Sequence, residues 1–415
     1  MQRHEVRVGM KPAVTAEEAR EHTHKRRLFV WPSETCVLKE VSVPYWSAKK
    51  KPAFISLFSG AMGLDLGLES AGMKNSGCLE LDKWACKTIR RNRPDLPLVE
   101  GDIRNWSGAE LLKKIGSHDI QLICGGPPCP SFSTAGRRQS FGDPRGEVMF
   151  DFLRIINELR PPFFIMENVR GILSAAIKHV PLSERPSKGR AFTAAEQKGS
   201  VLRLLKDEFG RMNYTVTVEL VNAADYGVPQ KRERVVFIGS RDGFQVSMPP
   251  PMYVSSGDMF TPRWRTLADA LTGLHEENPE ITPFSTARKK YLRLLKEGQN
   301  WRALPKGILP EAMGGAYASG GGKVGFYRRL SFDRPSPTVS TSPVQKSTCL
   351  CHPTALRPLS VREYARIQQF PDDWIFEGST AEKYRQIGNA VPVGLGHQIG
   401  RSILKYIVNY ENLSP

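Results

Sequence analysis

The sequence predicts an α/β protein with a doubly wound sheet and a second, smaller domain that is rich in loops. Short apolar runs alternate with helix-like segments from Ala53 onwards, the order typical of a sheet covered by helices. The first apolar run leads into a glycine-punctuated turn and a helix, as in nucleotide-binding units. Beyond Arg241 this periodicity gives way to proline, glycine, serine and interleaved arginine and aromatic residues.

The first unit joins the predicted strand FISLF to the turn and helix SGAMGLDLGLESAG. Its glycines, Gly60, Gly63 and Gly67, let a ligand approach the backbone, but their spacing is not the GxGxxG of a dinucleotide site. Two further predicted strands end in acids, Glu80 in LELD and Asp102 in GDIR. Acids at strand ends suit ribose hydroxyls and an adenine amine; the alternative is that each one caps a helix N-terminus.

The fourth predicted strand runs into LICGGPPCPSFSTAG, which carries Cys129. A strand that ends in Gly-Gly-Pro-Pro must open into a loop, and loops at the carboxyl ends of strands are where ligands bind in such sheets. Cys129 is therefore placed for chemistry. The alternative is that it is a buried small hydrophobic residue, as most free cysteines are.

The next units follow the same order. The helical segment VMFDFLRIINEL precedes a buried strand in FFIMENVRGIL, which is expected to end in Glu167-Asn168. A second helix, over SVLRLLKDEFGRMNY, is followed by the strand YTVTVELVNA. Then QKRER places Lys231, Arg232 and Arg234 directly before the strand VVFIG. This charge run is either a solvated face or an anion-binding group at the active edge of the sheet.

The closing part of the chain regains order. Ser360 and Glu363 have the spacing of a capping box and predict a helix over SVREYARIQQF. After the turn QIGNAVP, an apolar helix is long enough to pack back on the first domain.

Charge is the informative part of the composition. The formal net charge is +17, which favours a polyanionic partner over a merely basic soluble protein. Apolar runs are too short for a membrane span and the first residues lack a signal core, so we expect a cytoplasmic protein. The seven cysteines are predicted to be reduced, and their spacing predicts no metal site.

Taken in order, the motifs resemble those of the DNA (cytosine-5) methyltransferases. The matching segments are FISLFSGAMGLDLGLESAG, LELD, GDIR, GGPPCPSFSTAG, DPRGEVMFDF, MENV, QKRERVVFIG, RPLSVREYARIQQFPD and QIGNAVP. The resemblance implies a Rossmann-like domain that uses S-adenosyl-L-methionine, and a target-recognition domain that contacts double-stranded DNA. It divides the chain into a basic N-terminal extension (1–52), a catalytic and cofactor domain (53–243), a target-recognition domain (244–374) and a C-terminal segment on the catalytic domain (375–415).

The resemblance also implies roles for single residues. Cys129 is the nucleophile that attacks the flipped cytosine, Glu167 the hydrogen-bond donor to its N3, and Arg232 and Arg234 orient the base and phosphates. The residues implied to bind the cofactor are Phe58, Gly60, Gly63, Glu80, Asp102, Pro128, Val148, Asn389 and Ala390. Those implied to contact DNA are Ser133, Lys231, Arg328 and Arg329.

Two positions depart from the family pattern. Met62 stands where glycine is usual, a change expected to narrow the cofactor pocket, and Pro130 follows the nucleophile where glutamine is common. Neither removes a catalytic group. The chain is short and has one compact recognition region without zinc or chromatin modules, which favours a monomeric bacterial modification enzyme with a partner restriction endonuclease. The alternatives are an RNA cytosine-5 methyltransferase and a non-catalytic DNA-binding regulator.

Overall fold

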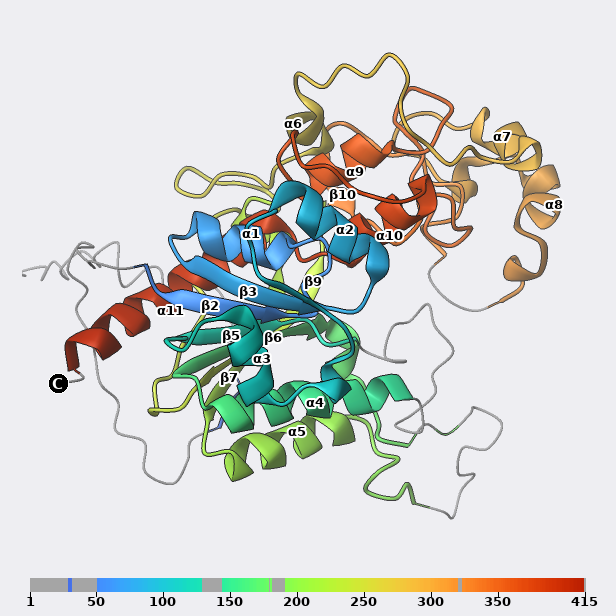
Figure 1. Ribbon diagram of the computed structural model, residues 1–415. Helices are drawn as coiled ribbons and strands as arrows, with labels where there is room; N and C mark the ends of the chain where they lie inside the picture. Colours follow the sequence, from blue (N-terminus) through green and yellow to red (C-terminus); the bar gives the residue numbers. More distant parts are fainter. Residues whose placement is uncertain are drawn as a thin grey trace, which may run out of the picture.

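The computed structural model describes residues 29–31, 51–128, 144–178, 180, 191–319 and 323–413. Within these ranges an eight-stranded sheet has the order β1-β7-β9-β6-β5-β2-β3-β4 (Figure 1). Its strands are β1 (Phe29–Trp31), β2 (Ala53–Leu57), β3 (Lys74–Glu80), β4 (Leu98–Glu100), β5 (Leu122–Gly125), β6 (Phe163–Val169), β7 (Thr215–Asn222) and β9 (Glu233–Ser240). The neighbours from β4 to β6 pair in parallel, whereas β9 and β7 are antiparallel to their neighbours.

The central strands are buried on both faces. Every residue of β2 and β5 is buried, as expected for parallel strands covered by helices on both sides. This explains why FISLF and LICG are continuous apolar runs rather than alternating ones. The strand β1 lies within the predicted N-terminal extension and pairs with β7, a contact that the mixed composition of that extension does not indicate.

Helices cover the two faces in separate layers (Figure 1). One layer contains α3 (Gly108–Ile115), α4 (Pro144–Leu159) and α5 (Ser200–Arg211), whose apolar side chains share a core with the sheet. The other contains α1 (Gly63–Ser70), α2 (Lys83–Asn92) and α11 (Val393–Leu413). The sheet is therefore doubly wound, as predicted. None of the described helices combines the length and apolarity needed to cross a bilayer.

The connections reverse direction between β2 and β5. The chain runs outwards from β2 to β3 and β4, then returns to β5 on the other side of β2 before it continues to β6. In open α/β sheets the crevice beside such a reversal, at the carboxyl ends of the strands, is the usual ligand site. This topology places the ends of β2, β3, β5 and β6 around one crevice.

Residues between the sheet and α9 (Val361–Ile367) form short elements joined by long connections. They are α6 (Leu267–Leu271), α7 (Thr286–Leu292), α8 (Leu309–Met313) and β10 (Ser336–Pro337), with several single-turn 3-10 helices. The strand β10 pairs in parallel with β8 (Gln230–Lys231), which ties this region to the QKRER segment. The poor periodicity of the sequence here reflects this loop-rich structure.

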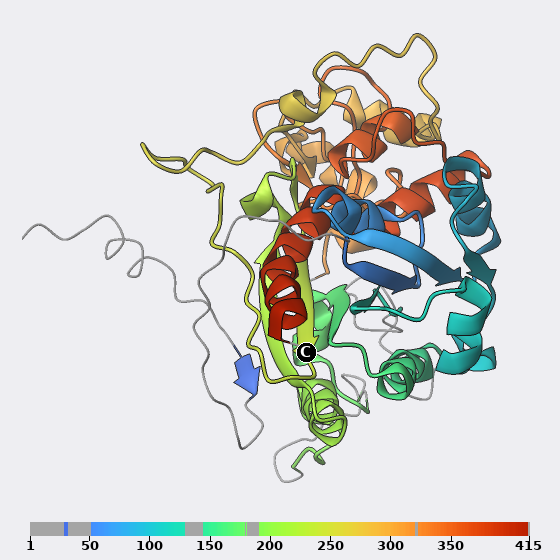
Figure 2. The ribbon, with the colours of Figure 1, turned by 60° about the vertical axis from the view of Figure 1, so that its left-hand side comes forward.

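The last helices return the chain to the sheet. Ser360 caps α9 in a complete capping box with Glu363, as the spacing predicts. After α10 (Thr380–Asn389), α11 runs along the face that also carries α1 (Figure 2). The two helices approach closely at glycines: a Cβ on Gly67 would lie 2.5 Å from the Val393 carbonyl oxygen and 2.6 Å from the Cα of Gly396.

Replacing Gly67 with alanine should therefore separate α1 from α11. We expect a loss of about 1–3 kcal/mol in the free energy of unfolding, because backbone atoms cannot move aside as a flexible side chain can. The matched control is Gly210→Ala in α5, where nothing lies within 4 Å of the added carbon and helix propensity favours alanine by up to about 1 kcal/mol. Thermal unfolding measures both; equal melting temperatures for the two variants would contradict the close packing.

Candidate active site

A cleft of about 1100 Å³ lies at the carboxyl ends of the strands. It is bordered by residues at or after the ends of β2, β3, β5 and β6, and by residues at the end of α10. All of the residues predicted to hold the cofactor line it: Phe58, Gly60, Gly63, Glu80, Asp102, Pro128, Val148, Asn389 and Ala390. Glu167, Arg232 and Arg234 also line it, so the fold brings two separately predicted groups into one space.

The turn after β2 forms one wall and has a left-handed backbone. Phe58, Gly60 and Met62 have φ values of 59°, 54° and 69°. Gly63 must lack a side chain, because a Cβ there would lie 2.1 Å from the Val391 carbonyl oxygen. The C-terminal segment therefore lies directly on this turn.

Met62 does not narrow the cleft, which corrects the expectation from sequence. Its side chain is fully buried and is absent from the cleft lining. It packs instead in a core that includes Leu330, Leu359 and Tyr364. Glycine at this position would suit the left-handed backbone of the turn, and here burial of the methionine side chain accompanies the strained conformation.

Glu80 is held in place by backbone donors. Its Oε2 accepts a hydrogen bond from the Gly60 amide at 2.7 Å, and its Oε1 accepts from the amides of Leu81 and Asp82 at 2.9 and 2.7 Å. Burial raises the pKa of this carboxyl, and the three amides oppose that effect. The remaining lone pairs of the carboxylate can accept hydrogen bonds from ribose hydroxyls.

The other acids at this edge take capping roles. Asp82, which follows Glu80 in LELD, caps the N-terminus of α2 through the amides of Trp84 and Ala85. Asp102 caps a short 3-10 helix and pairs with Arg104, whose guanidinium lowers the pKa of the Asp102 carboxyl. Asp102 thus combines capping with a place in the cleft lining.

A second wall carries a carboxylate paired with a guanidinium. Glu167 lies near the end of β6 and Arg234 near the start of β9; these strands are antiparallel neighbours, so the two side chains come within reach of each other. Arg234 Nε lies 2.6 Å from Glu167 Oε1, and each side chain is only 11% exposed. Burial lowers the pKa of Arg234, while the carboxylate of Glu167 opposes that shift. The pair forms a charged, nearly dry contact inside the cleft.

The loop after β5 is tied to this wall. Asn168 donates from Nδ2 to the Pro127 carbonyl at 3.3 Å. Pro127 and Pro128 line the cleft immediately before Cys129 in the chain. Cys129, Pro130 and Ser133 themselves lie outside the described residues.

Arg232 has a different role from the one predicted. Its side chain is fully buried, and its Nη1 donates to the Val339 carbonyl at 3.1 Å. Its Nη2 donates to the carbonyls of Gly388 and Ala390 at 2.9 and 3.0 Å. One terminal nitrogen is thus engaged by backbone of the loop-rich region and the other by backbone of the C-terminal segment. The geometry gives Arg232 the task of holding the C-terminal segment over the cleft rather than that of binding phosphates.

The predicted DNA contacts Lys231 and Arg328 differ in their exposure to solvent. Lys231 is exposed, with its ammonium 4.8 Å from the centre of the Trp264 ring. Arg328 is half-buried and donates from Nε to the Cys349 carbonyl. Neither residue is in the cleft lining.

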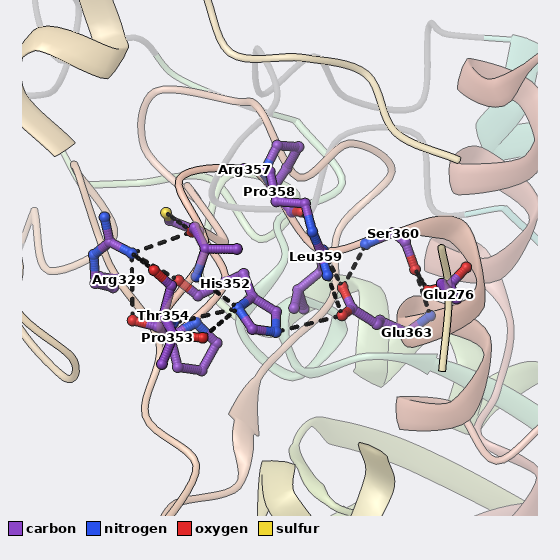
Figure 3. A network of polar contacts seen from close by, with 12 residues as sticks. Glu276, Arg329, His352, Pro353, Thr354, Arg357, Pro358, Leu359, Ser360 and Glu363 are labelled. Atoms are coloured by element: carbon purple, nitrogen blue, oxygen red, sulfur yellow. Dashed lines mark hydrogen bonds and ion pairs between the residues drawn. The ribbon is translucent and has the colours of Figure 1, made fainter. Parts of the chain in front are cut away.

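Arg329 is a structural cation, contrary to the prediction of a DNA contact. It is buried, its Nη2 donates to the Leu292 carbonyl, and its Nη1 contacts the carbonyls of residues 352–355 (Figure 3). The same loop carries His352, whose Nε2 lies 3.5 Å from Glu363, and burial lowers the pKa of this histidine. Arg329 therefore fixes the loop that precedes α9.

Sequence reasoning did not single out every residue of the cleft. Trp84, Arg385 and Asp65 are among the lining residues that it missed. Trp84 follows the acids in LELDKW, and an aromatic residue beside ribose-type acids signals a surface for a purine ring. Arg385 pairs with Asp82 at 2.7 Å, a contact between residues about three hundred positions apart that no local pattern reveals.

The donors and acceptors suit the cofactor that the motif resemblance implies. The glycine turn admits close backbone approach, Glu80 offers fixed acceptors, and Trp84 offers an aromatic ring at the same edge.

Replacing Arg232 with leucine should leave three buried carbonyls without their donor. We expect a loss of about 3 kcal/mol or more in the free energy of unfolding, because donors on charged groups contribute more than neutral ones. The exposed neighbour gives the control: Lys231→Met should change the melting temperature little. A melting temperature for Arg232→Leu within error of that control would contradict the holding role.

Comparisons with known proteins find similar chains over most of its length. A family model described as C-5 cytosine-specific DNA methylase matches residues 53–405. The Type II methyltransferase M.Sau96I of Staphylococcus aureus is 39% identical over 85% of this chain and 76% of its own length. M.Eco47II of Escherichia coli is 37% identical over 90% of this chain and 81% of its own length. The crystal structure of a candidate DNA modification methyltransferase from an E. coli prophage matches with a TM-score of 0.58 at 26% identity, covering 86% of this chain and all of that one.

Proposed function

Because the chain belongs to the C-5 cytosine-specific DNA methylases, we propose that it methylates one cytosine within a short, specific sequence of double-stranded DNA. It is a DNA cytosine-5 methyltransferase and uses S-adenosyl-L-methionine. The observation that carries the proposal is the buried ion pair of Glu167 with Arg234, in the same cleft as the cofactor residues and beside the loop that leads to Cys129.

The proposed chemistry depends on making C5 of cytosine nucleophilic. The thiolate of Cys129 adds to C6, and Glu167 holds a proton at N3, so that electron density moves to C5. S-adenosyl-L-methionine, when bound, supplies the methyl group that C5 accepts. Removal of the C5 proton then restores the ring and expels Cys129 as the thiolate. Arg234 orients Glu167, since its Nε lies 2.6 Å from the carboxylate.

The target base must leave the helix for this chemistry. C6 and N3 of a stacked, paired cytosine are not accessible together, and flipping the base costs a few kcal/mol. The net charge of +17 supports attraction to the phosphates, with Lys231 as a candidate contact on the surface. We assign sequence reading to the loop-rich region 244–374.

We infer a role in restriction and modification from the relatives. Several similar proteins are Type II methyltransferases, including those from S. aureus and E. coli. A partner endonuclease that cuts the same sequence would then be blocked by the methyl group. We propose that the methyltransferase itself acts as a monomer.

Bisulfite sequencing of a plasmid incubated with the protein and S-adenosyl-L-methionine tests the proposal. Cytosines should be protected at one short recurring sequence by the wild type and at none by Cys129→Ala, because the alanine variant cannot form the adduct. Cofactor and DNA binding should persist in the variant. Protection by Cys129→Ala would exclude covalent catalysis at this residue. If cytosines were protected in RNA but not in the plasmid, the substrate would be RNA rather than DNA.

Glu167→Gln should slow methyl transfer by on the order of 10²–10⁴-fold, because glutamine cannot hold a proton at N3 as a carboxyl does. DNA affinity should be unchanged. Glu233→Gln is the matched control, since Glu233 is an exposed acid on the same strand as Arg234 and pairs with Arg170. Single-turnover rates decide: equal rates for the two variants would remove Glu167 from the mechanism.

A further inference from the structure

The helix α2 carries part of the wall of the cleft. Its first turn and the two residues before it all line the cleft, namely Leu81, Asp82, Lys83, Trp84 and Ala85. Asp82 joins this helix to the acid assigned to the cofactor: its backbone amide donates to Glu80 Oε1 at 2.7 Å, and its side chain caps α2. The direction of the Glu80 carboxylate therefore depends on where α2 lies.

The helix α10 lies beside α2 and lines the same cleft with one of its faces (Figure 1). Positions 382, 385, 386 and 389 all belong to the lining. They are spaced by three, four and seven residues, so they share one face of the helix. The separation of α2 and α10 therefore sets the distance between two groups of lining residues.

A closed ring of hydrogen bonds joins the two helices outside the cleft. Thr88, in the middle of α2, is completely buried and does not belong to the cleft lining. Its Oγ1 donates to Gln386 Oε1 at 2.7 Å and accepts from the Glu377 amide at 2.9 Å. Gln386 Nε2 donates in turn to the Glu377 carbonyl at 2.8 Å. Because a carbonyl can only accept, it fixes which end of the glutamine amide faces the Thr88 hydroxyl.

The other polar contacts between α2 and the C-terminal segment are more exposed to water. At the cleft end, Arg385 Nη2 lies 2.7 Å from Asp82 Oδ2, but both side chains are partly exposed and such ion pairs contribute little. At the far end, the Asn92 side chain exchanges two hydrogen bonds with the backbone of Ile375, also at an exposed position. The ring at Thr88 is buried, where a hydrogen bond is stronger than in water. It is therefore the main polar tie between the two helices.

We propose that Thr88 is a positioning residue for cofactor binding: its hydroxyl holds α2 and α10 at the separation at which both fit the adenosyl group. This inference rests on the use of S-adenosyl-L-methionine by the chain. Without the ring the helices can adopt other separations, and a ligand that must select the fitting one binds more weakly. The product S-adenosyl-L-homocysteine has the same adenosyl group, so both ligands depend equally on Thr88.

The alternative is that the Thr88 hydroxyl only satisfies buried polar groups. Valine keeps the branched shape of threonine but leaves the Glu377 amide and Gln386 Oε1 without this partner, so Thr88→Val loses stability in either case. Only the positioning role also lowers the ligand affinity of the folded protein. Affinities measured well below the melting temperature of the variant therefore separate the two roles.

Isothermal titration calorimetry of the full chain with each ligand tests the proposal. We expect Thr88→Val to bind both ligands about five- to tenfold more weakly than wild type, as when only one molecule in about five to ten has the fitting separation. Thr88→Ser keeps the hydroxyl and should remain within about twofold of wild type. For Thr88→Val the KM for S-adenosyl-L-methionine should rise by the same factor as the dissociation constant, with little change in kcat, because only binding is affected.

Thr217→Val is the matched control. It removes another buried hydroxyl, on β7, a strand with no residue among those that line the cleft in the described structure. Its affinities for both ligands should equal those of the wild type even where its melting temperature falls.

Hydrogen exchange on the wild type decides the question if Thr88→Val does not fold. Coupling is reciprocal, so a ligand whose affinity depends on the ring also stabilises the ring, by the same factor of about five- to tenfold. Either ligand should therefore slow amide exchange in residues 375–379, which contain the Glu377 amide and lie outside the cleft lining. Residues 266–272, which include α6 and also lie outside the lining, should exchange at an unchanged rate.

The outcomes separate this inference from the use of the cofactor. Four results would overturn the role of Thr88: unchanged affinities in Thr88→Val, weaker binding of only one ligand, an equal loss in Thr88→Ser, or equal exchange in 375–379 with and without ligand. Failure of the wild type to bind either ligand would instead contradict the cofactor assignment.

Discussion

The cleft depends on the close packing of the C-terminal segment against the turn after β2. The C-terminal segment must lie directly on the turn after β2, and only the absence of a side chain at Gly63 allows the Val391 carbonyl to come so close. From the other side, the buried guanidinium of Arg232 donates to the carbonyls of Val339, Gly388 and Ala390. A buried guanidinium loses hydration, so it stabilises the fold only while its donors are engaged. Displacing the segment would therefore open the cleft and, at the same time, leave the buried guanidinium of Arg232 without its hydrogen-bond acceptors.

The acidic side chains of the cleft fall into two groups, which differ in whether a cation is paired with them. The carboxylates of Glu80 and Asp65 are buried where burial raises their pKa values, and the backbone amides around Glu80 partly compensate. Glu167 is instead paired directly with Arg234. Within the described parts of the chain, the acids near the first turn therefore lie without a paired cation, whereas Glu167 on the opposite wall already has its counter-charge in Arg234.

The extent to which sequence predicted this structure depends on how local each feature is. The strands β2, β5 and β6 are continuous apolar runs, and the α9 capping box is a four-residue pattern, so all could be read locally. The reversed direction of β9, which makes it antiparallel to both β6 and β7, could not, because an apolar run has no direction. The roles of Arg232 and Arg329 were also hidden: a basic residue looks solvated until distant carbonyls surround it, and Gly388 is 156 positions from Arg232. The cofactor residues predicted from the motifs all line the cleft, whereas Asp65 lies within a motif but its place in the lining is visible only in three dimensions.

Met62 shows how the recognition region is joined to the cofactor turn. The residue has the left-handed conformation that glycine adopts most easily, with φ at 69°, and its side chain extends away from the cleft. It belongs to a buried core that also contains Leu330 and Leu359, which precede α9, and Tyr364, which lies on α9. A glycine at this position would relieve the backbone strain but would leave a cavity in that core. The buried apolar contacts of the methionine side chain therefore offset the cost of its left-handed backbone. The turn that carries Met62 also carries Gly60, whose amide holds Glu80, so one buried side chain joins the core of the loop-rich region to the wall of the cleft.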